Sequence, residues 1–240
     1  MVCAVILAGG FGIRLREVVA STPKPMALIA DRPFLELQMD YLIEQGVDEF
    51  ILALGYKSEV IKNHFGNSYR NIPITYSTEK EPLGTGGALL FATQNIVGEQ
   101  PFLALNGDSF FDVDLSELYK KHNDNNSDFT FALMRSNENG RYMGVETDSS
   151  DRVKSLNHPA RNIGDTANAG IYLINPQTLI HFENRIHTKI SLEEEIVPYL
   201  LANEYNVFGV SFDNEFIDIG TPKDYYRAQS IIPVPMSVSV

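Results

Sequence analysis

The segment LAGGFGIRLREVVASTPKPM, close to the N-terminus, gathers residue types that bind phosphate groups. Its three glycines directly follow an apolar run, and glycine lets a backbone approach an anionic ligand closely. Arg14 can hold two phosphate oxygens through its planar guanidinium group, and Lys24 is a point charge between two prolines that restrict its backbone. Each feature taken alone also fits an ordinary turn or a solvated surface cation. Their combination predicts a triphosphate site.

Two common phosphate-binding motifs are excluded by the same residues. A P-loop requires Gly-Lys-Ser/Thr after its glycines, whereas Ile13 and Arg14 follow Gly12 here. The dinucleotide-binding fingerprint requires a further glycine at the position of Leu15. The predicted phosphate site therefore belongs to another class.

The elements that must position these residues follow an α/β pattern, in which short apolar runs alternate with amphipathic stretches. We expect strands over 2–8, 50–54, 74–77, 102–105, 129–134, 144–147, 170–174 and 208–212. We expect helices over 33–46, 58–66, 87–93, 115–122 and 192–202, and a last helix from 222 onward. Pro33 suits a first helical position, and Ser58, Asp114, Ser191 and Thr221 suit helix caps.

The bulk composition limits the classes of partner. The chain has 240 residues, of which 44% are hydrophobic, enough for one large α/β core. A net charge of -12 argues against non-specific nucleic-acid binding, which needs a basic face. The single cysteine, Cys3, excludes a disulfide framework, and no apolar run is long enough to span a bilayer. The sequence predicts a cytoplasmic protein with no nucleic-acid or membrane partner.

Four landmarks that occur in order resemble the signature of the sugar-1-phosphate nucleotidyltransferases. They are G-G-x-G-x-R-L with P-K-P-M, then EKEPLGTGGA, LNGDSFFDVDL and FIDIGTPKDYYRA. The resemblance covers nearly the whole chain and is greatest to bacterial D-glycero-D-manno-heptose 1-phosphate guanylyltransferases, with mannose-1-phosphate guanylyltransferases next. It implies a single Rossmann-like nucleotidyltransferase domain over residues 1–230, with a mixed central sheet flanked by helices and no C-terminal β-helix. Residues 231–240 are expected to form a loosely held tail.

The reaction implied by the resemblance is attack of a sugar 1-phosphate oxygen on the α-phosphorus of a nucleoside triphosphate, which releases pyrophosphate. The sugar phosphate arrives largely as a dianion, so catalysis depends mainly on positioning and electrostatics. By resemblance, Arg14 neutralises the β- and γ-phosphates, and Lys24 lies between the α-phosphate and the sugar phosphate. Asp108 and Asp218 would jointly hold Mg²⁺, which prefers a few carboxylates with phosphate oxygens and water. Plainer explanations are a turn aspartate for Asp108 and a helix cap for Asp218.

The resemblance also implies the residues that bind each substrate. The implied nucleotide-binding residues are Leu7, Ala8, Gly9, Gly10, Gly12, Glu79, Pro82, Gly84 and Thr85. The implied sugar-phosphate-binding residues are Asn106, Gly144, His158, Asn168 and Asp218.

Glu79 bears on the choice of base. Uridylyl- and thymidylyltransferases that look like this chain tend to carry glutamine at this position. A carboxylate only accepts hydrogen bonds, and guanine offers N1–H and N2–H₂ side by side as donors, whereas the carbonyls of uracil would repel it. Glu79 therefore favours GTP, with a solvated carboxylate at a strand end as the alternative.

Two departures from the family pattern bear on binding. Ile13 replaces the usual threonine and removes a hydroxyl that could contact a phosphate. Many relatives carry Phe-x-Glu-Lys-Pro, whereas this chain has Asn157-His158-Pro159 with no lysine. His158 or Arg161 can replace the missing cation, and a surface-turn histidine is the alternative.

Three functional interpretations follow. The first is a guanylyltransferase that makes GDP-heptose, or GDP-mannose, for cell-surface polysaccharides. The second keeps the reaction but uses UTP or dTTP with a hexose 1-phosphate. The third is a regulatory module that binds nucleotide sugars without turnover, against which the intact Arg14, Lys24, Asp108 and Asp218 argue. A homodimer through the apolar tail is a further expectation.

Overall fold

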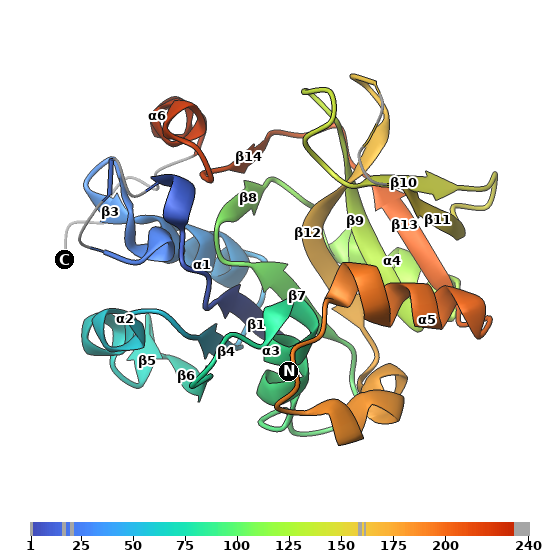
Figure 1. Ribbon diagram of the computed structural model, residues 1–240, viewed down its shortest axis with the longest axis horizontal. Helices are drawn as coiled ribbons and strands as arrows, with labels where there is room; N and C mark the ends of the chain where they lie inside the picture. Colours follow the sequence, from blue (N-terminus) through green and yellow to red (C-terminus); the bar gives the residue numbers. More distant parts are fainter. Residues whose placement is uncertain (1, 16–17, 20–21, 158–159, 161, 233–240) are drawn as a thin grey trace.

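A ten-stranded mixed sheet forms the centre of the computed structural model, which describes residues 2–15, 18–19, 22–157, 160 and 162–232 (Figure 1). Its strands are β1 (Cys3–Ala8), β4 (Glu49–Leu54), β5 (Ser68–Tyr69), β6 (Ile72–Thr78), β7 (Phe102–Asn106), β9 (Phe129–Arg135), β10 (Gly144–Thr147), β11 (Val153–Asn157), β12 (Thr166–Ile174) and β13 (Val207–Ser211). The strand order is β11-β10-β12-β7-β1-β4-β6-β5, and β9 pairs with both β12 and β13. β1 is parallel to β4 and β7, whereas β12 is antiparallel to β7 and β9, so the predicted mixed sheet is confirmed.

Helices and two small strand pairs surround this sheet. The helices are α1 (Phe34–Glu44), α2 (Ser58–Phe65), α3 (Gly84–Thr93), α4 (Leu115–Asp124), α5 (Val197–Ala202) and α6 (Pro222–Ile231). Shorter helical segments are η1 (Ile13–Leu15), η2 (Lys24–Met26), η3 (Pro176–Arg185) and η4 (Leu192–Ile196). The two strand pairs are β2 (Leu28–Ile29) with β3 (Arg32–Pro33), and β8 (Ser109–Phe111) with β14 (Phe216–Asp218).

The alternation of side chains along each strand divides the core between the two faces of the sheet. In β1, Ile6 belongs to the cluster that also contains buried residues of α1, α2 and α4. Val5 belongs to the cluster that contains buried residues of α3 and α5. Successive side chains of a strand point to opposite faces, so a strand with apolar residues at every position is buried by helices on both sides.

Three predicted helix caps are confirmed. The side chains of Asp114, Ser191 and Thr221 accept hydrogen bonds from backbone N–H groups in the first turns of α4, η4 and α6. The capping box at Ser191 closes differently from the expected one, because Glu195 rather than Glu194 accepts the hydrogen bond from the Ser191 N–H group, at 3.0 Å. η4 is a π-helical turn, which contains more residues than an α-helical turn. The glutamate that reaches the Ser191 N–H group therefore lies one position later in the sequence.

Pro33 and Ser58 have other roles at their helix starts than the sequence predicts. Helix α1 begins at Phe34 because Pro33 has an extended backbone and pairs with Leu28 in the β2–β3 hairpin. Helix α2 begins at Ser58 itself, because Lys57 takes the N-cap position with a left-handed φ of 55°. Ser58 is therefore the first helical residue and not a cap.

The C-terminal helix α6 lies beside the N-terminal hairpin β2–β3 (Figure 1). Tyr225 Oη and Gln229 Nε2 donate hydrogen bonds to the Leu28 carbonyl oxygen, at 2.8 Å and 3.0 Å. Ile232, within the predicted tail, is buried next to the end of α6, and residues 233–240 lie outside the described residues. None of the helices in the described part of the chain has the length and apolar character needed to cross a membrane.

Candidate active site

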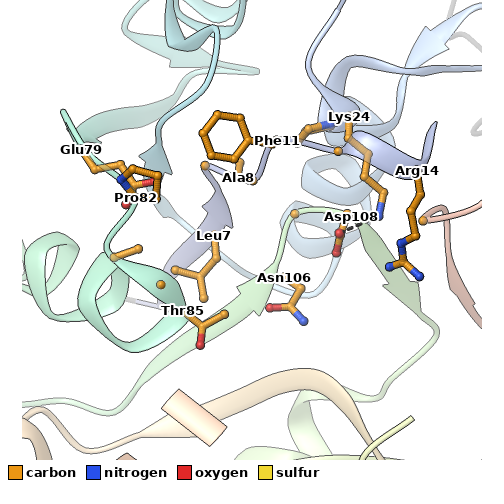
Figure 2. Close-up of a pocket in the computed structure, with 18 residues that line it drawn as sticks. Leu7, Ala8, Phe11, Arg14, Lys24, Glu79, Pro82, Thr85, Asn106 and Asp108 are labelled. Carbon is orange, nitrogen blue, oxygen red and sulfur yellow. Dashed lines mark hydrogen bonds and ion pairs between the residues drawn. The ribbon is translucent and has the colours of Figure 1, made fainter. Parts of the chain in front are cut away.

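A cavity of about 720 Å³ opens at the carboxyl ends of the parallel strands β1 and β7 (Figure 2). Ligands bind at this edge in many open α/β sheets, because loops from several strands converge there. The lining residues are Leu7, Ala8, Gly9, Gly10, Phe11, Gly12, Arg14, Lys24, Pro25, Glu79, Pro82, Gly84, Thr85, Ala88, Asn106, Gly107, Asp108 and Gly220. All of the predicted nucleotide-binding residues, together with Arg14, Lys24 and Asp108, therefore line one cavity.

The cavity has a charged end. Lys24 is 8% exposed, and its Nζ atom lies 2.6 Å from Asp108 Oδ2 and 3.1 Å from Asp218 Oδ1. Arg14 lies beside Lys24 in Figure 2, and its exposed side chain also lines the cavity. One ammonium group thus contacts both predicted metal-binding carboxylates.

The pairing of β8 with β14 brings the two aspartates together. Asp108 directly precedes β8, and Asp218 is the last residue of β14, where it pairs with Ser109. The Ile219 N–H group donates a hydrogen bond to the Asp108 carbonyl oxygen at 3.0 Å. Two short antiparallel strands therefore fix the separation of two carboxylates that come from distant parts of the chain.

Gly220 allows the Asp218 carboxylate to fold back toward the cavity. The Gly220 N–H group donates a hydrogen bond to Asp218 Oδ1 at 2.7 Å. A Cβ atom at position 220 would lie 2.8 Å from that oxygen and 3.2 Å from Lys24 Nζ. Sequence analysis did not single out this glycine, although its place at the end of FIDIG, two residues after an aspartate, is a usable signal.

Arg141 is a second cation at Asp218 that sequence analysis missed. Its guanidinium group lies 3.4 Å from Asp218 Oδ2 and 2.6 Å from Asp224 Oδ2, and it also pairs with Glu138 at 2.9 Å. The Arg141 side chain is 17% exposed and packs over the ring of Tyr142 at 5.0 Å. It holds the last residue of β14 and the first turn of α6 in a fixed relation.

These contacts determine the charge of Asp218. Burial raises the pKa of the Asp218 carboxyl, but Lys24, Arg141 and the Gly220 N–H group outweigh burial and hold the pKa below its ordinary value. Asp218 is therefore an anion at neutral pH. Asp218 is not among the described residues that line the cavity, but it shares the Lys24 ammonium group with Asp108, which does line it. The described residues contain no cluster of three or more metal-ligating side chains.

Glu79 lies at the opposite end of the cavity from Lys24 (Figure 2). Its Oε1 atom is close to Gly9 and Gly55, where an added Cβ atom would lie 2.9 Å and 2.6 Å away. Its Oε2 atom accepts a hydrogen bond from the Leu83 N–H group at 3.0 Å. Burial raises the pKa of Glu79, partly offset by this hydrogen bond. The carboxylate is half-buried at the cavity wall and has one hydrogen-bond donor in the neighbouring loop, the Leu83 N–H group.

The glycines of EKEPLGTGGA pack against a neighbouring segment. Helix α3 begins at Gly84 and not at Gly87 as predicted. Gly84 has a φ of +73°, and a Cβ atom there would lie 2.7 Å from the Ile190 carbonyl oxygen, which accepts a hydrogen bond from the Gly87 N–H group. The helix therefore starts where its backbone touches residues 188–192, a contact with no local sequence signal.

A partly buried chain of hydrogen bonds joins Thr85 to Asn168. Thr85 Oγ1 and Tyr172 Oη donate to the two carboxylate oxygens of Glu193, at 2.7 Å and 2.9 Å. Asn168 Nδ2 donates to Tyr172 Oη at 2.9 Å. Asn168 thus stands behind the cavity wall, connected to it through a fully buried tyrosine.

The predicted sugar-phosphate residues are only partly brought together. Asn106 lines the cavity, whereas Gly144 and Asn168 are not among the described residues that line it. His158, its alternative Arg161 and the side chain of Ile13 lie outside the part of the chain that the structure describes. Asp112 accepts a hydrogen bond from Tyr41 Oη at 2.9 Å, and Asp114 caps α4 as predicted.

Comparison with known proteins agrees with this geometry. A family model described as "Nucleotidyl transferase" matches residues 3–233. The chain is 43% identical over 226 residues to D-glycero-alpha-D-manno-heptose 1-phosphate guanylyltransferase of Campylobacter jejuni, which covers 93% of this chain and 97% of that protein. It is 40% identical over 226 residues to the protein of the same name from Aneurinibacillus thermoaerophilus, with 94% and 96% covered.

Solved structures of similar proteins have the same fold as this chain. The crystal structure of HddC from Yersinia pseudotuberculosis matches with a TM-score of 0.83 and 32% identity, and covers 95% of this chain and 98% of that one. The structure of HddC complexed with GMP-PN matches over the same shares with a TM-score of 0.81 and 33% identity. The family match spans the cavity, both aspartates and the glycine loop, and the chain belongs to the nucleotidyl transferase family.

Proposed function

We propose that the protein transfers GMP from GTP to D-glycero-D-manno-heptose 1-phosphate, which yields GDP-heptose and pyrophosphate. The observation that carries the proposal is one cavity with Glu79 at one end and Lys24 and Asp108 at the other, where Lys24 also contacts Asp218. The names of the two relatives that are 43% and 40% identical support the nucleotide and the sugar.

In this reaction an oxygen of the sugar 1-phosphate attacks the α-phosphorus of GTP. A new P–O bond forms, and the bond between the α-phosphorus and the oxygen that bridges to the β-phosphate breaks with pyrophosphate as the leaving group. The glycine loop binds phosphate oxygens through its N–H groups, and Arg14 neutralises the leaving pyrophosphate. In this proposal the Lys24 ammonium group, which contacts both carboxylates, lies between the two phosphates and offsets the repulsion between them.

Asp108 and Asp218 are the residues that would hold Mg²⁺. Both supply carboxylate oxygens, both already contact one cation, and Asp218 is kept ionised by its neighbours. This donor set fits a metal that takes its remaining ligands from phosphate oxygens and water. When bound, the metal supplies charge neutralisation for the triphosphate.

Glu79 selects guanine in this proposal. An ionised carboxylate accepts hydrogen bonds from N1–H and N2–H₂ of guanine and repels the carbonyl groups of uracil. Its placement in the cavity wall between Gly9 and Gly55, supported by the Leu83 N–H group, favours this role.

The test is a matrix of four nucleoside triphosphates against heptose, mannose and glucose 1-phosphates, with pyrophosphate release as the readout and Mg²⁺ present. We expect GTP with the heptose 1-phosphate to exceed every other pair by about tenfold or more in kcat/KM. A preference for mannose 1-phosphate would overturn the sugar assignment, and a preference for UTP or dTTP would overturn the base assignment. Nucleotide binding without pyrophosphate release from any pair would identify a regulatory binding module.

We also propose that the enzyme works in the cytoplasm. The single cysteine, Cys3, is buried in β1 with a pKa raised to about 12 by burial, which suits an unreactive thiol in a reducing cytoplasm. The homodimer and the use of the product in cell-surface polysaccharides stay predictions.

A further inference from the structure

Phe11 is the one residue with a side chain in the stretch Gly9–Gly12. It lines the cavity, yet 46% of its surface is exposed to solvent. Its ring contacts the ring of Tyr56, which follows strand β4, with the ring centroids 5.5 Å apart and the planes tilted by 43°. An aromatic side chain held by another aromatic ring, and still open to the cavity, has a free face for a ligand.

The position of Phe11 along the cavity identifies the part of the ligand that it meets. Figure 2 shows the ring between Glu79 and Pro82 on one side and Lys24 and Arg14 on the other. A nucleoside triphosphate with its base at Glu79 and its phosphates at Lys24 therefore passes the Phe11 ring with its nucleoside half.

We infer that Phe11, supported by Tyr56, forms the aromatic wall against which the nucleoside of the bound triphosphate packs. This inference rests on the proposed function, because it takes the base to lie at Glu79. Every base and every ribose offers an apolar face, so stacking on an aromatic ring tolerates different bases. Phe11 then sets the affinity for all nucleotides, and Glu79 sets the choice among them.

The inference is tested by calorimetric titration of wild type, Phe11→Ala and Phe11→Tyr with GTP, UTP and tripolyphosphate. Phe11→Ala should lower the affinity for GTP and the affinity for UTP by a similar factor, about tenfold or more, as expected for the loss of one aromatic stack. The nucleotide affinities of Phe11→Tyr should stay within about twofold of those of wild type, because this variant keeps the aromatic ring. Tripolyphosphate affinity should not change, since the phosphates lie beyond the ring. A parallel loss for tripolyphosphate would mean that the loop backbone is disturbed, and would overturn the inference.

A spectroscopic test is available because the chain contains no tryptophan. Phe11→Trp introduces one indole, whose fluorescence should change on addition of GTP but not of tripolyphosphate. The matched control is Tyr226→Trp, at a residue of α6 that is 62% exposed and is not among the described residues lining the cavity. Its fluorescence should respond to neither ligand. Equal responses of the two variants to GTP would overturn the inference.

The outcomes separate this inference from the proposed function. If wild type binds GTP tightly and Phe11→Ala binds it equally tightly, the inference fails and the proposed function stands. If wild type binds no nucleoside triphosphate, both fail.

Discussion

Lys24 Nζ lies 3.1 Å from Asp218 Oδ1, although the two residues are 194 positions apart in the sequence. The same nitrogen lies 2.6 Å from Asp108 Oδ2. The lysine proposed to serve two phosphates is thus also the counter-ion of the two carboxylates proposed to hold the metal. The proposal therefore predicts that the ammonium group and a divalent cation compete for the same oxygens.

Replacement of Lys24 tests this competition. Lys24→Gln should reduce kcat/KM by about 100-fold or more, because a positioned cation at the transferring phosphate is lost. The same variant should bind Mn²⁺ more tightly than wild type without nucleotide, since no ammonium group occupies the carboxylates. Electron paramagnetic resonance of free Mn²⁺ measures the binding. Lys120→Gln, at an exposed residue of α4, is the control and should change neither property. Weaker Mn²⁺ binding in Lys24→Gln would contradict the competition.

Asp108 and Asp112 form a matched pair for a test of the metal site. Both lie in LNGDSFFDVDL, but Asp108 contacts Lys24 at the cavity, whereas Asp112 accepts a hydrogen bond from Tyr41 Oη. Asp108→Asn should lower the rate of pyrophosphate release by about 100-fold or more, as does removal of a group that stabilises charge in the transition state. Asp112→Asn should keep nearly full activity. Chelation of Mg²⁺ should abolish activity in wild type, and persistence of activity in EDTA would argue against a metal-dependent reaction.

Glu79 tests the choice of base. Glu79→Gln replaces an acceptor-only group with one that also donates, so the ratio of kcat/KM for GTP to that for UTP should fall by about tenfold, the size expected for one mismatched hydrogen-bonding group. Glu81→Gln, at an exposed residue of the same segment, is the control. Competition between the two nucleotides measures the ratio. An unchanged ratio would remove Glu79 from base selection.

The pH dependence of GTP binding checks the same residue independently. Burial raises the pKa of Glu79 above its ordinary value, so its carboxylate gains a proton at a higher pH than an exposed glutamate. Protonation removes the acceptor for guanine, and GTP affinity should fall as the pH is lowered through this raised pKa. Affinity titrations in Glu79→Gln should lack this decline. The same decline in both proteins would assign it to another group.

Arg141 tests whether a residue behind the site positions Asp218. Arg141→Met should reduce both Mn²⁺ affinity and kcat/KM by about 10- to 100-fold, which is the usual effect of losing a partner of a metal ligand. Arg141→Lys should restore part of the Mn²⁺ affinity and part of kcat/KM. It keeps the positive charge, but it lacks the guanidinium group that contacts Asp218 and Asp224 at the same time. Arg135→Met, in an exposed pair with Asp213, is the control. Loss of stability with unchanged Mn²⁺ affinity would show a merely structural role.

Asp114 tests a purely local determinant of stability. Its carboxylate accepts hydrogen bonds from the Ser116 hydroxyl and from the Ser116 and Glu117 N–H groups at the start of α4, and these, the hydroxyl first, lower its pKa. Asp114→Ala should lower the free energy of unfolding by about 1 kcal/mol, the usual cost of losing an N-cap. Calorimetry should show a fall of about 2–4 °C in melting temperature, and the activity should not change. Asp124→Ala, at the other end of α4, is the control.

Much of the fold was predictable from short-range patterns. The strand periods, the caps at Asp114, Ser191 and Thr221, and the glycine loop before Arg14 depend on neighbours within a few residues. At Pro33 and at the start of α3 the prediction was wrong because of a pairing or packing contact outside the local pattern. Pro33 is extended because it pairs with Leu28, and α3 starts early because its glycines meet Ile190.

The sequence by itself determined the chemistry of the cavity, since the types and order of the glycines, Arg14, Lys24 and the two aspartates are sufficient for a phosphate site. Only the tertiary structure decided which residues support them. Arg141, Gly220 and Tyr56 contact Asp218 and Phe11 through strand pairings and helix packing that no local pattern encodes. The physical reason is that side-chain chemistry belongs to each residue, whereas distances between remote residues depend on how the whole sheet is ordered.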